Sequence, residues 1–535
     1  MNQLQLILSP AEAADLTAIR KAVASTLHLP FAAVTNVRII RRSVDARQRN
    51  IKVLLTVEPL LSESNPILCE KETEERFFPD YHDVHSSPRQ VIIVGAGPAG
   101  LFAALTLLEH GIRPVILERG KEVSERKRDI ALLNRNEGLN PESNYCFGEG
   151  GSGTFSDGKL FSRSKKRGDM QRVMELFHYH GATDSVLYEA HAHIGSDRLP
   201  AIIRNMRETI ISKGGSVHFS TKVTRLIVED NIAVGVVTDN GCKYRGEAVI
   251  LAIGHSAHDT YRMLTKCGVR LETKGFAMGV RVEHPQTLIN RLMYHLDGRD
   301  INYQQSIVNY LGNASYSLVT QVDGRGVYSF CMCPGGHIVP AGSTTDGCVV
   351  NGMSASHRNS PYANSGIVVE IRPEDIPAEF LNPTDGLEGL RFQEYVEHLA
   401  AENGEAADKA PAQRLLDFVS SKASSDLPAC SYLPGIVPSR LDMWLPPMIG
   451  RRLQQGFRDF DRKYRGYLTN DAVILGVESR SSSAVRIPRD KYTLQHIDIR
   501  GLYPCGEGAG YAGGITSSAL DGINAALSIA NGHRE

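Results

Sequence analysis

The run Gly95-Ala96-Gly97-Pro98-Ala99-Gly100 constrains the fold of this chain more than any other feature of its sequence. An apolar, β-branched stretch beginning at Val91 precedes the run, and helix-forming residues follow it. The first glycine permits a tight turn, the second lets the backbone approach a pyrophosphate, and the third allows close packing of helix on strand. Pro98 and Ala99 open the helix, whose N-terminus favours negative charge. The pattern predicts the strand, turn and helix of a dinucleotide-binding fold.

An acidic residue stands where such a fold needs one. Glu118 ends the next β-branched stretch, and we expect its carboxylate to accept hydrogen bonds from an adenosine ribose. We assign the adjacent Arg119 to the same site. Because FAD and NAD share the adenosine diphosphate half, this part of the sequence does not distinguish between them.

The C-terminal segment decides between the two cofactors. In GLYPCGEGAGYAGGITSSALDGINAALSIA, Gly506 and Glu507 follow a short apolar strand, and the stretch Gly513–Thr516, which includes Gly514 and Ile515, opens a helix of small residues. This segment resembles the glutathione-reductase-type flavoproteins, in which a late acidic residue faces the ribityl chain and the last helix points its N-terminus at the flavin. The resemblance implies bound FAD, with Glu507 in the acidic role where many relatives carry Asp. It also implies that Val223 and Gly254, which ends GEAVILAIG, lie on the adenine side.

A second nominal glycine motif at Gly148, Gly150 and Gly153 lacks a preceding strand and a following helix. We interpret it as a flexible loop against the flavin, from which Ser152, Thr154 or Lys159 reaches the cofactor; a plain surface loop is the alternative. Without a second dinucleotide fold, a diffusible NAD(P)H donor would have to dock directly on the flavin.

The cysteines of Cys331-Met332-Cys333-Pro334-Gly335-Gly336 are separated by a single residue, which is closer than in the usual redox pair. Two ligands are too few for a zinc site, so we expect no bound metal. A thiol role stays open, and reduced cysteines on a strand entering a turn are the favoured alternative.

From residue 90 onward the chain resembles a bacterial family of FAD-dependent dehydrogenases of unknown substrate. The resemblance is carried by three runs: Cys331–Gly336, GVRVEHPQ (Gly279–Gln286) and the loop NYCFGEGGSGTFSDGKL. The resemblance implies FAD and oxidoreductase activity. Arginine suits anionic substrates and histidine suits proton transfer. The weak catalytic candidates are therefore Arg281, His284, His337, Arg480 and Arg486, together with Cys331 and Cys333.

We expect an α/β protein with four segments. A small N-terminal α/β domain and its linker occupy residues 1–85, with strands at Leu4–Leu8, Asn36–Arg41 and Ile51–Val57 and a helix at Ala11–Leu27. The FAD-binding fold occupies residues 90–274 and 448–535. A mixed α/β substrate domain is inserted at residues 275–447.

The chain has 535 residues, a net charge of -1 and nine cysteines. Near-neutral charge argues against a nucleic-acid partner, and an odd, modest cysteine count favours a reducing compartment, which we take to be the cytoplasm. We expect no secretory signal and no membrane span.

The favoured function is an FAD-dependent oxidoreductase, a dehydrogenase or reductase, that passes hydride or electrons through flavin to a small-molecule substrate or acceptor. One alternative is a flavoprotein whose N-terminal domain docks a protein or RNA partner, with flavin as a redox sensor or structural element. Another is a flavin monooxygenase.

Overall fold

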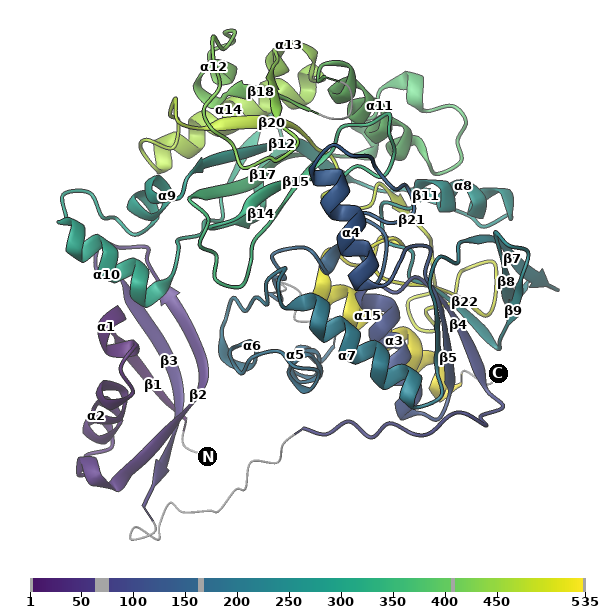
Figure 1. The fold of residues 1–535 in the computed structure, drawn as a ribbon, viewed down its shortest axis with the longest axis horizontal. Coiled ribbons are helices and arrows are strands. Elements are labelled where there is room, and N and C mark those ends of the chain that lie inside the picture. The colour runs from purple at the N-terminus through teal and green to yellow at the C-terminus, as the bar shows by residue number, and fades with distance from the viewer. Residues whose placement is uncertain (1–2, 63–76, 162–167, 406–408, 533–535) are drawn as a thin grey trace.

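A computed structural model describes residues 3–62, 77–161, 168–405 and 409–532. The N-terminal unit stands to one side in Figure 1, the FAD-binding unit occupies the lower right, and the middle domain lies above both. Most of the expected linker, residues 63–76, lies outside the described residues. Among the described helices, none combines the length and the apolar character needed to cross a bilayer.

The N-terminal unit is an antiparallel sheet in the order β1-β3-β2 with two helices on one face. Asp15 splits the expected single helix, because its side chain accepts a hydrogen bond from the Thr17 amide and starts a second helix. Arg42 forms an ion pair of 2.8 Å with Glu189, so the unit is tied to the FAD-binding part. The elements are β1 (Leu4–Leu8), α1 (Pro10–Ala13), α2 (Leu16–Thr26), η1 (Phe31–Ala33), β2 (Val34–Asp45) and β3 (Lys52–Leu61).

The FAD-binding unit has a parallel five-stranded sheet in the order β22-β10-β4-β5-β6. The edge strand β22 comes from the C-terminal segment, so the unit is built from two distant parts of the chain. The strands are β4 (Gln90–Val94), β5 (Arg113–Leu117), β6 (Ser216–His218), β10 (Ala248–Leu251) and β22 (Leu502–Pro504), with a separate antiparallel sheet of β7 (Val223–Glu229), β8 (Ile232–Thr238) and β9 (Lys243–Arg245). The helices are α3 (Pro98–Glu109), α4 (Val123–Asn134), η2 (Gly151–Gly153), α5 (Met170–Tyr179), α6 (Ser185–Tyr188), α7 (Leu199–Ser212), α8 (His258–Lys266) and α15 (Ile515–Asn531).

The middle domain is built on a mostly antiparallel sheet in the order β13-β14-β17-β12-β20-β18-β19. Its strands are β12 (Phe276–Pro285), β13 (Val319–Val322), β14 (Arg325–Cys333), β17 (Tyr362–Ile371), β18 (Ala410–Arg414), β19 (Ile436–Pro438) and β20 (Val473–Glu478); β15 (His337–Pro340) pairs with β16 (Val350–Met353), and β11 (Glu272–Thr273) with β21 (Val485–Arg486). Its helices are α9 (Gln286–Met293), α10 (Ile301–Leu311), η3 (Pro373–Asp375), η4 (Ala378–Phe380), α11 (Glu388–Glu402), α12 (Leu415–Val419), α13 (Leu441–Trp444) and α14 (Pro447–Lys463).

The middle sheet continues past residue 447, where the sequence placed the domain boundary. Strand β20 pairs with β12 along Val473 to Glu478, in the interior of the sheet. Its run VILGVE is buried throughout and apolar up to Glu478, which is typical of a central strand. The predicted mixed α/β class is confirmed, with both parallel and antiparallel sheets.

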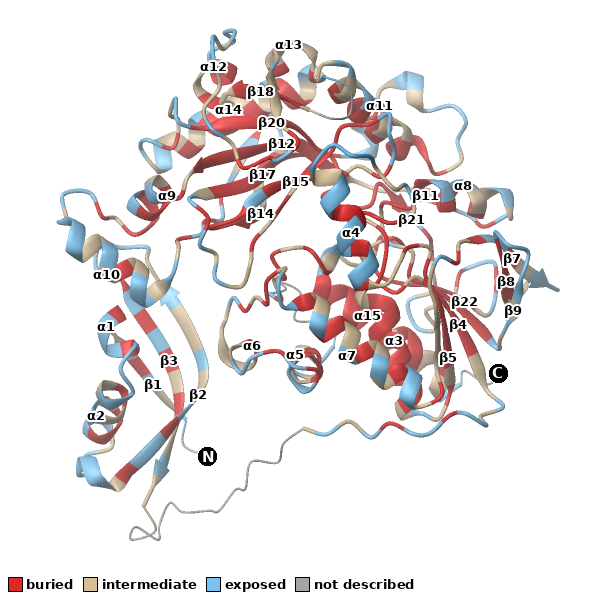
Figure 2. Ribbon diagram, in the orientation of Figure 1, coloured by how far each residue is buried: buried red, intermediate tan, exposed pale blue. Residues whose placement is uncertain are grey.

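Two buried helices bring the two parts of the FAD-binding unit together. Helix α3 is buried along Ala99–Leu108, and α15 is buried over most of its length (Figure 2). A Cβ on Gly522 of α15 would lie 2.1 Å from the Ala99 carbonyl oxygen. Only a glycine allows the two helices to approach this closely.

Candidate cofactor and redox site

The glycine run forms the predicted strand, turn and helix. Gly95 has φ +105°, and a Cβ there would lie 2.4 Å from the Ala252 carbonyl oxygen, while a Cβ on Gly100 would lie 2.0 Å from the Gly95 carbonyl oxygen. These glycines are required by close packing. At Gly97 an added Cβ would meet only the Gly151 Cα, at 3.9 Å, among the described residues. Gly97 therefore presents open backbone at the start of α3, as a pyrophosphate contact needs.

The second cofactor segment also ends at an open helix start. Gly513 and Gly514, just before α15, are exposed, and an added Cβ on either would meet no described heavy atom within 4 Å. No described side chain caps α3 or α15, so the amides of both first turns are available to an anionic or electron-rich group. The donors and the space fit the pyrophosphate of FAD at α3 and the flavin ring at α15. When bound, FAD would supply the hydride and electron transfer.

The loop of residues 144–160 joins these two helix starts. The Gly150 amide donates to the Ala96 carbonyl at 2.8 Å, and a Cβ on Gly153 would lie 3.2 Å from Ile515 and 3.7 Å from Pro98. Thr516 Oγ1 donates to the Leu160 carbonyl at 2.6 Å. The start of α3 and the start of α15 therefore converge on one loop.

Three side chains of this loop were expected to reach the cofactor. Ser152 is exposed, and Thr154 is buried with its hydroxyl donating to the Glu149 carbonyl at 2.8 Å. Lys159 points instead toward the middle domain, where it contacts Cys331 and Cys333.

Glu118 has local partners that the sequence did not reveal. Its carboxylate accepts hydrogen bonds from the amides of Ala96, Gly120 and Gly148 at 2.8, 2.9 and 3.0 Å, and the residue is 5% exposed. The carboxylate therefore ties the glycine turn to the neighbouring loops. Its contact with an adenosine ribose stays a prediction.

The remaining cofactor candidates are Arg119, Val223 and Gly254, and their surroundings differ. Arg119 forms ion pairs with Glu142 at 2.6 Å and Asp259 at 2.8 Å. Val223 is buried in an apolar cluster at the start of β7, whereas Gly254 has φ +71° and an added Cβ there would meet no described heavy atom within 4 Å.

The turn after β22 is held by a buried acidic residue of α15. Asp521 accepts a hydrogen bond from the Gly506 amide at 2.7 Å and forms an ion pair with Arg489 at 2.6 Å. The next residue, Glu507, lies 3.5 Å from His255 and keeps 22% of its side chain exposed. The turn is thereby fixed while the Glu507 carboxylate stays accessible.

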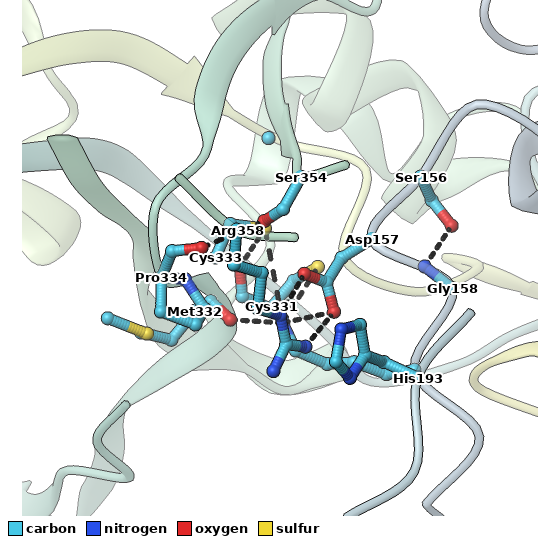
Figure 3. A network of polar contacts seen from close by, with 12 residues as sticks. Ser156, Asp157, Gly158, His193, Cys331, Met332, Cys333, Pro334, Ser354 and Arg358 are labelled. Carbon is cyan, nitrogen blue, oxygen red and sulfur yellow. Dashed lines mark hydrogen bonds and ion pairs between the residues drawn. The ribbon is translucent and has the colours of Figure 1, made fainter. Parts of the chain in front are cut away.

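Three catalytic candidates come together in the middle domain. Cys331 and Cys333 lie where the pairing of β14 with β17 shifts register, and Arg281 of β12 reaches the Cys333 sulfur at 3.5 Å. Lys159 Nζ lies 3.9 Å from each sulfur and donates to the Met332 carbonyl. Figure 3 shows the two cysteines and Met332.

Two charged residues beside this cluster, Asp157 and Arg358, were not identified from the sequence. Asp157 forms a two-point ion pair with Arg358 and lies 3.8 Å from Lys159 (Figure 3). Burial alone would raise the pKa of Asp157, but the charges of Lys159 and Arg358 outweigh it and lower that pKa to about 2. His193, which was also not identified from the sequence, donates a hydrogen bond from Nε2 to the Ser356 carbonyl at 3.1 Å. No local signal marks these residues, because they meet across distant segments.

The other four candidates lie elsewhere. His284 is fully buried, its Nε2 lies 2.9 Å from the Tyr467 carbonyl, and burial lowers its pKa to about 4. Arg480 forms a buried ion pair with Glu397 at 2.9 Å. His337 and Arg486 are exposed on β15 and β21. The described residues contain no group of three or more His, Cys, Asp or Glu arranged to hold a metal ion.

Three family models match the chain. Residues 89–239 match an FAD binding domain, residues 275–481 match the family "FAD-dependent protein, C-terminal domain-like", and residues 1–59 match a domain of unknown function. These matches support the prediction of FAD and leave the nicotinamide donor untested.

Relatives span the chain to different extents. An uncharacterised protein of Clostridium beijerinckii is 39% identical over 527 residues, which covers 96% of each chain. The tRNA uridine 5-carboxymethylaminomethyl modification enzyme MnmG of Geobacillus kaustophilus is 26% identical over 181 residues, covering 32% of this chain and 25% of that protein. Among solved structures, the flavin-dependent brominase Bmp2 has 13% identity and a TM-score of 0.35, covering 82% of this chain and 78% of that one. Similarity at that score carries no functional conclusion.

Proposed function

The chain belongs to a family of FAD-dependent proteins that includes the Clostridium beijerinckii relative, and from this we propose that it is an FAD-dependent oxidoreductase. Bound FAD would supply the transfer of hydride or electrons from a diffusible donor such as NAD(P)H to a small-molecule acceptor. The middle domain binds that acceptor.

One observation carries this proposal: the starts of α3 and α15 converge on Gly153. The two helix starts lie far apart in the sequence, since one helix follows β4 and the other follows β22. The close contact of Gly522 with Ala99 fixes the two helices against each other. This geometry supports one FAD extended from the α3 turn to the start of α15.

The residues then take separate roles. The first turn of α3 binds the pyrophosphate through backbone amides, and the first turn of α15 stabilises negative charge on the reduced flavin ring. Glu507 hydrogen-bonds the ribityl chain. Lys159 and Arg358 lie at the junction with the middle domain, where the acceptor binds. A nicotinamide donor docks against the flavin itself, since the described residues form one parallel sheet of the dinucleotide-binding kind.

The test begins with the visible spectrum of the purified protein and anaerobic addition of NADH or NADPH. Bleaching of the flavin by either donor supports the proposal. Oxygen consumption in proportion to product would replace it with a monooxygenase, and bound flavin with no turnover of any donor or acceptor would favour a docking flavoprotein.

A variant pair tests the location of FAD. Gly97→Ala adds a Cβ to open space and should weaken FAD binding without lowering the melting temperature of the apoprotein. Gly450→Ala is the matched control: its Cβ would meet its nearest described neighbour, Leu445, at 3.7 Å, far from the FAD unit. Equal FAD affinity in both variants would contradict the assignment of the α3 turn.

A further inference from the structure

Cys331 and Cys333 have their side chains on the same side of an irregular strand. The register of β14 against β17 shifts between Phe330 and Cys333, and Cys331 adopts φ +46°, a left-handed conformation that is unfavourable for a residue with a side chain. The Cys333 thiol folds back and donates to the Cys331 carbonyl at 3.3 Å. In a regular strand, residues two apart would point the same way but lie farther from each other along the chain. The bulge brings the two thiols together.

Positive charges surround this pair. Lys159 lies 3.9 Å from both sulfurs, and Arg281 lies 3.5 Å from the Cys333 sulfur. Both cations also have acidic partners: Asp157 pairs with Lys159 at 3.8 Å, and Glu478 pairs with Arg281 at 2.9 Å. Arg358, which also pairs with Asp157, adds a further positive charge.

The two thiols differ in acidity. The adjoining Cys333 side chain, helped by the charges of Lys159 and Arg281, lowers the pKa of Cys331 well below its usual range, although burial and the charge of Asp157 oppose this. The adjoining Cys331 side chain, with burial, raises the pKa of Cys333 well above its usual range. Cys331 is therefore the more acidic of the two thiols, and it is also the one that is partly exposed.

The cluster is partly accessible to solvent, and the loop that carries Lys159 also reaches the start of α15. Cys331 is partly exposed while Cys333 is buried, and the Lys159 side chain keeps 36% of its surface accessible. The residue after Lys159 is Leu160, whose carbonyl accepts the hydrogen bond from Thr516 at the start of α15. Figure 3 shows Asp157 and Arg358 closing one side of the cluster.

We propose that Cys331 and Cys333 form a redox-active pair that closes reversibly to a disulfide by exchange with a small-molecule disulfide. The Cys331 thiolate attacks one sulfur of that disulfide, which forms a mixed disulfide and releases one thiolate. Cys333 then loses its proton to solvent and attacks the Cys331 sulfur, closing the ring and releasing the second thiolate. The two cysteines lose two electrons, the small disulfide gains them, and the two released thiolates become thiols by taking up protons. This chemistry goes beyond the proposed flavin activity and requires no flavin reduction.

The experiment equilibrates the FAD-loaded protein with buffers of reduced and oxidised glutathione, followed by alkylation, trypsin digestion and mass spectrometry. Residues 326–358 form one tryptic peptide that contains Cys331, Cys333 and the buried Cys348, which serves as an internal control. We expect Cys331 and Cys333 to become linked and protected together as the buffer becomes more oxidising, and to reopen with dithiothreitol. Cys331→Ser and Cys333→Ser should each abolish the link, whereas Cys348→Ser should keep it.

A pair that stays reduced across the series, or Cys331 that stops as a mixed disulfide with glutathione, would overturn the proposal. Lys159 variants test the electrostatic part. Lys159→Met should move the pH midpoint of Cys331 alkylation upward by about one unit or more, while Lys159→Arg keeps the charge and the midpoint near wild type. An unchanged midpoint in Lys159→Met would also count against it. Because the readout is thiol chemistry, it stays informative if the protein reduces no acceptor through its flavin.

Discussion

Gly522→Ala tests whether the contact between α3 and α15 builds the FAD site. Alanine is the better helix former, so the change alone would stabilise an exposed helix by about 0.5–1 kcal/mol. At residue 522, however, the new Cβ would lie 2.1 Å from the Ala99 carbonyl oxygen. The clash is with backbone, which cannot rotate away as a side chain would.

The size of the effect follows from these opposing contributions. Overpacking of a buried contact costs about 1–3 kcal/mol, and two helices buried between other elements have little room to separate. We therefore expect Gly522→Ala to lower the free energy of unfolding by about 1–2 kcal/mol. Since Ala99 belongs to the glycine run, its displacement should also weaken FAD binding about tenfold, which corresponds to roughly 1.4 kcal/mol.

Urea unfolding of the apoprotein and titration with FAD measure the two effects. Gly450→Ala in α14 is the control for helix propensity, since its Cβ would have ordinary contacts, and it should be slightly stabilising. Gly456→Ala, whose Cβ would lie 2.6 Å from a Val327 side-chain carbon, should destabilise the middle domain without weakening FAD binding. Gly522→Ala as stable as wild type, with unchanged FAD affinity, would refute the reasoning.

Three further changes act on buried charges. Asp157→Asn should cost about 2 kcal/mol at neutral pH, because a folded pKa lowered from 3.8 to about 2 contributes stability above the unfolded pKa; the difference from wild type in urea unfolding should shrink as the pH falls from about 4 toward 2. Asp521→Asn leaves Arg489 without its ion pair and loosens the turn at residue 506, so FAD titration should show weaker binding than in wild type. Glu397→Gln leaves the Arg480 charge buried and unpaired and should destabilise the protein by about 3–5 kcal/mol in urea, while the folded fraction keeps its FAD.

The sequence predicted those parts of the FAD site that are encoded by contiguous residues. The turn at Gly95–Gly100 combines a strand, three glycines and a helix within one short segment, so its pattern is readable without tertiary information. The start of α15 was predicted for the same reason, because its glycines and its helix-forming residues are contiguous. The role of Gly522 was not, because nothing near it in the sequence indicates that Ala99 lies against it.

Glu118 shows a second limit of prediction from the sequence. Its position at the end of β5 was predicted, but its three amide partners come from separate segments that only the folded chain brings together. The middle domain shows the same limit more strongly. Of the arginine and histidine candidates, only Arg281 lies at the cysteine pair, and His284 is buried against Tyr467. Residue type alone does not distinguish a buried structural group from one that faces a substrate.

One loop connects the FAD site to the cysteine pair, and this has an energetic consequence. The Gly150 amide is bonded to the glycine run, the Leu160 carbonyl to the first turn of α15, and Lys159 to the carbonyl between the two cysteines. A cofactor that orders this loop also fixes the ammonium group beside Cys331. Linkage is reciprocal, so a change in the charge of the cysteine pair must alter FAD affinity by the same factor by which FAD alters the acidity of the pair. FAD binding and ionisation of the cysteine pair are therefore coupled equilibria, although the two sites belong to different domains.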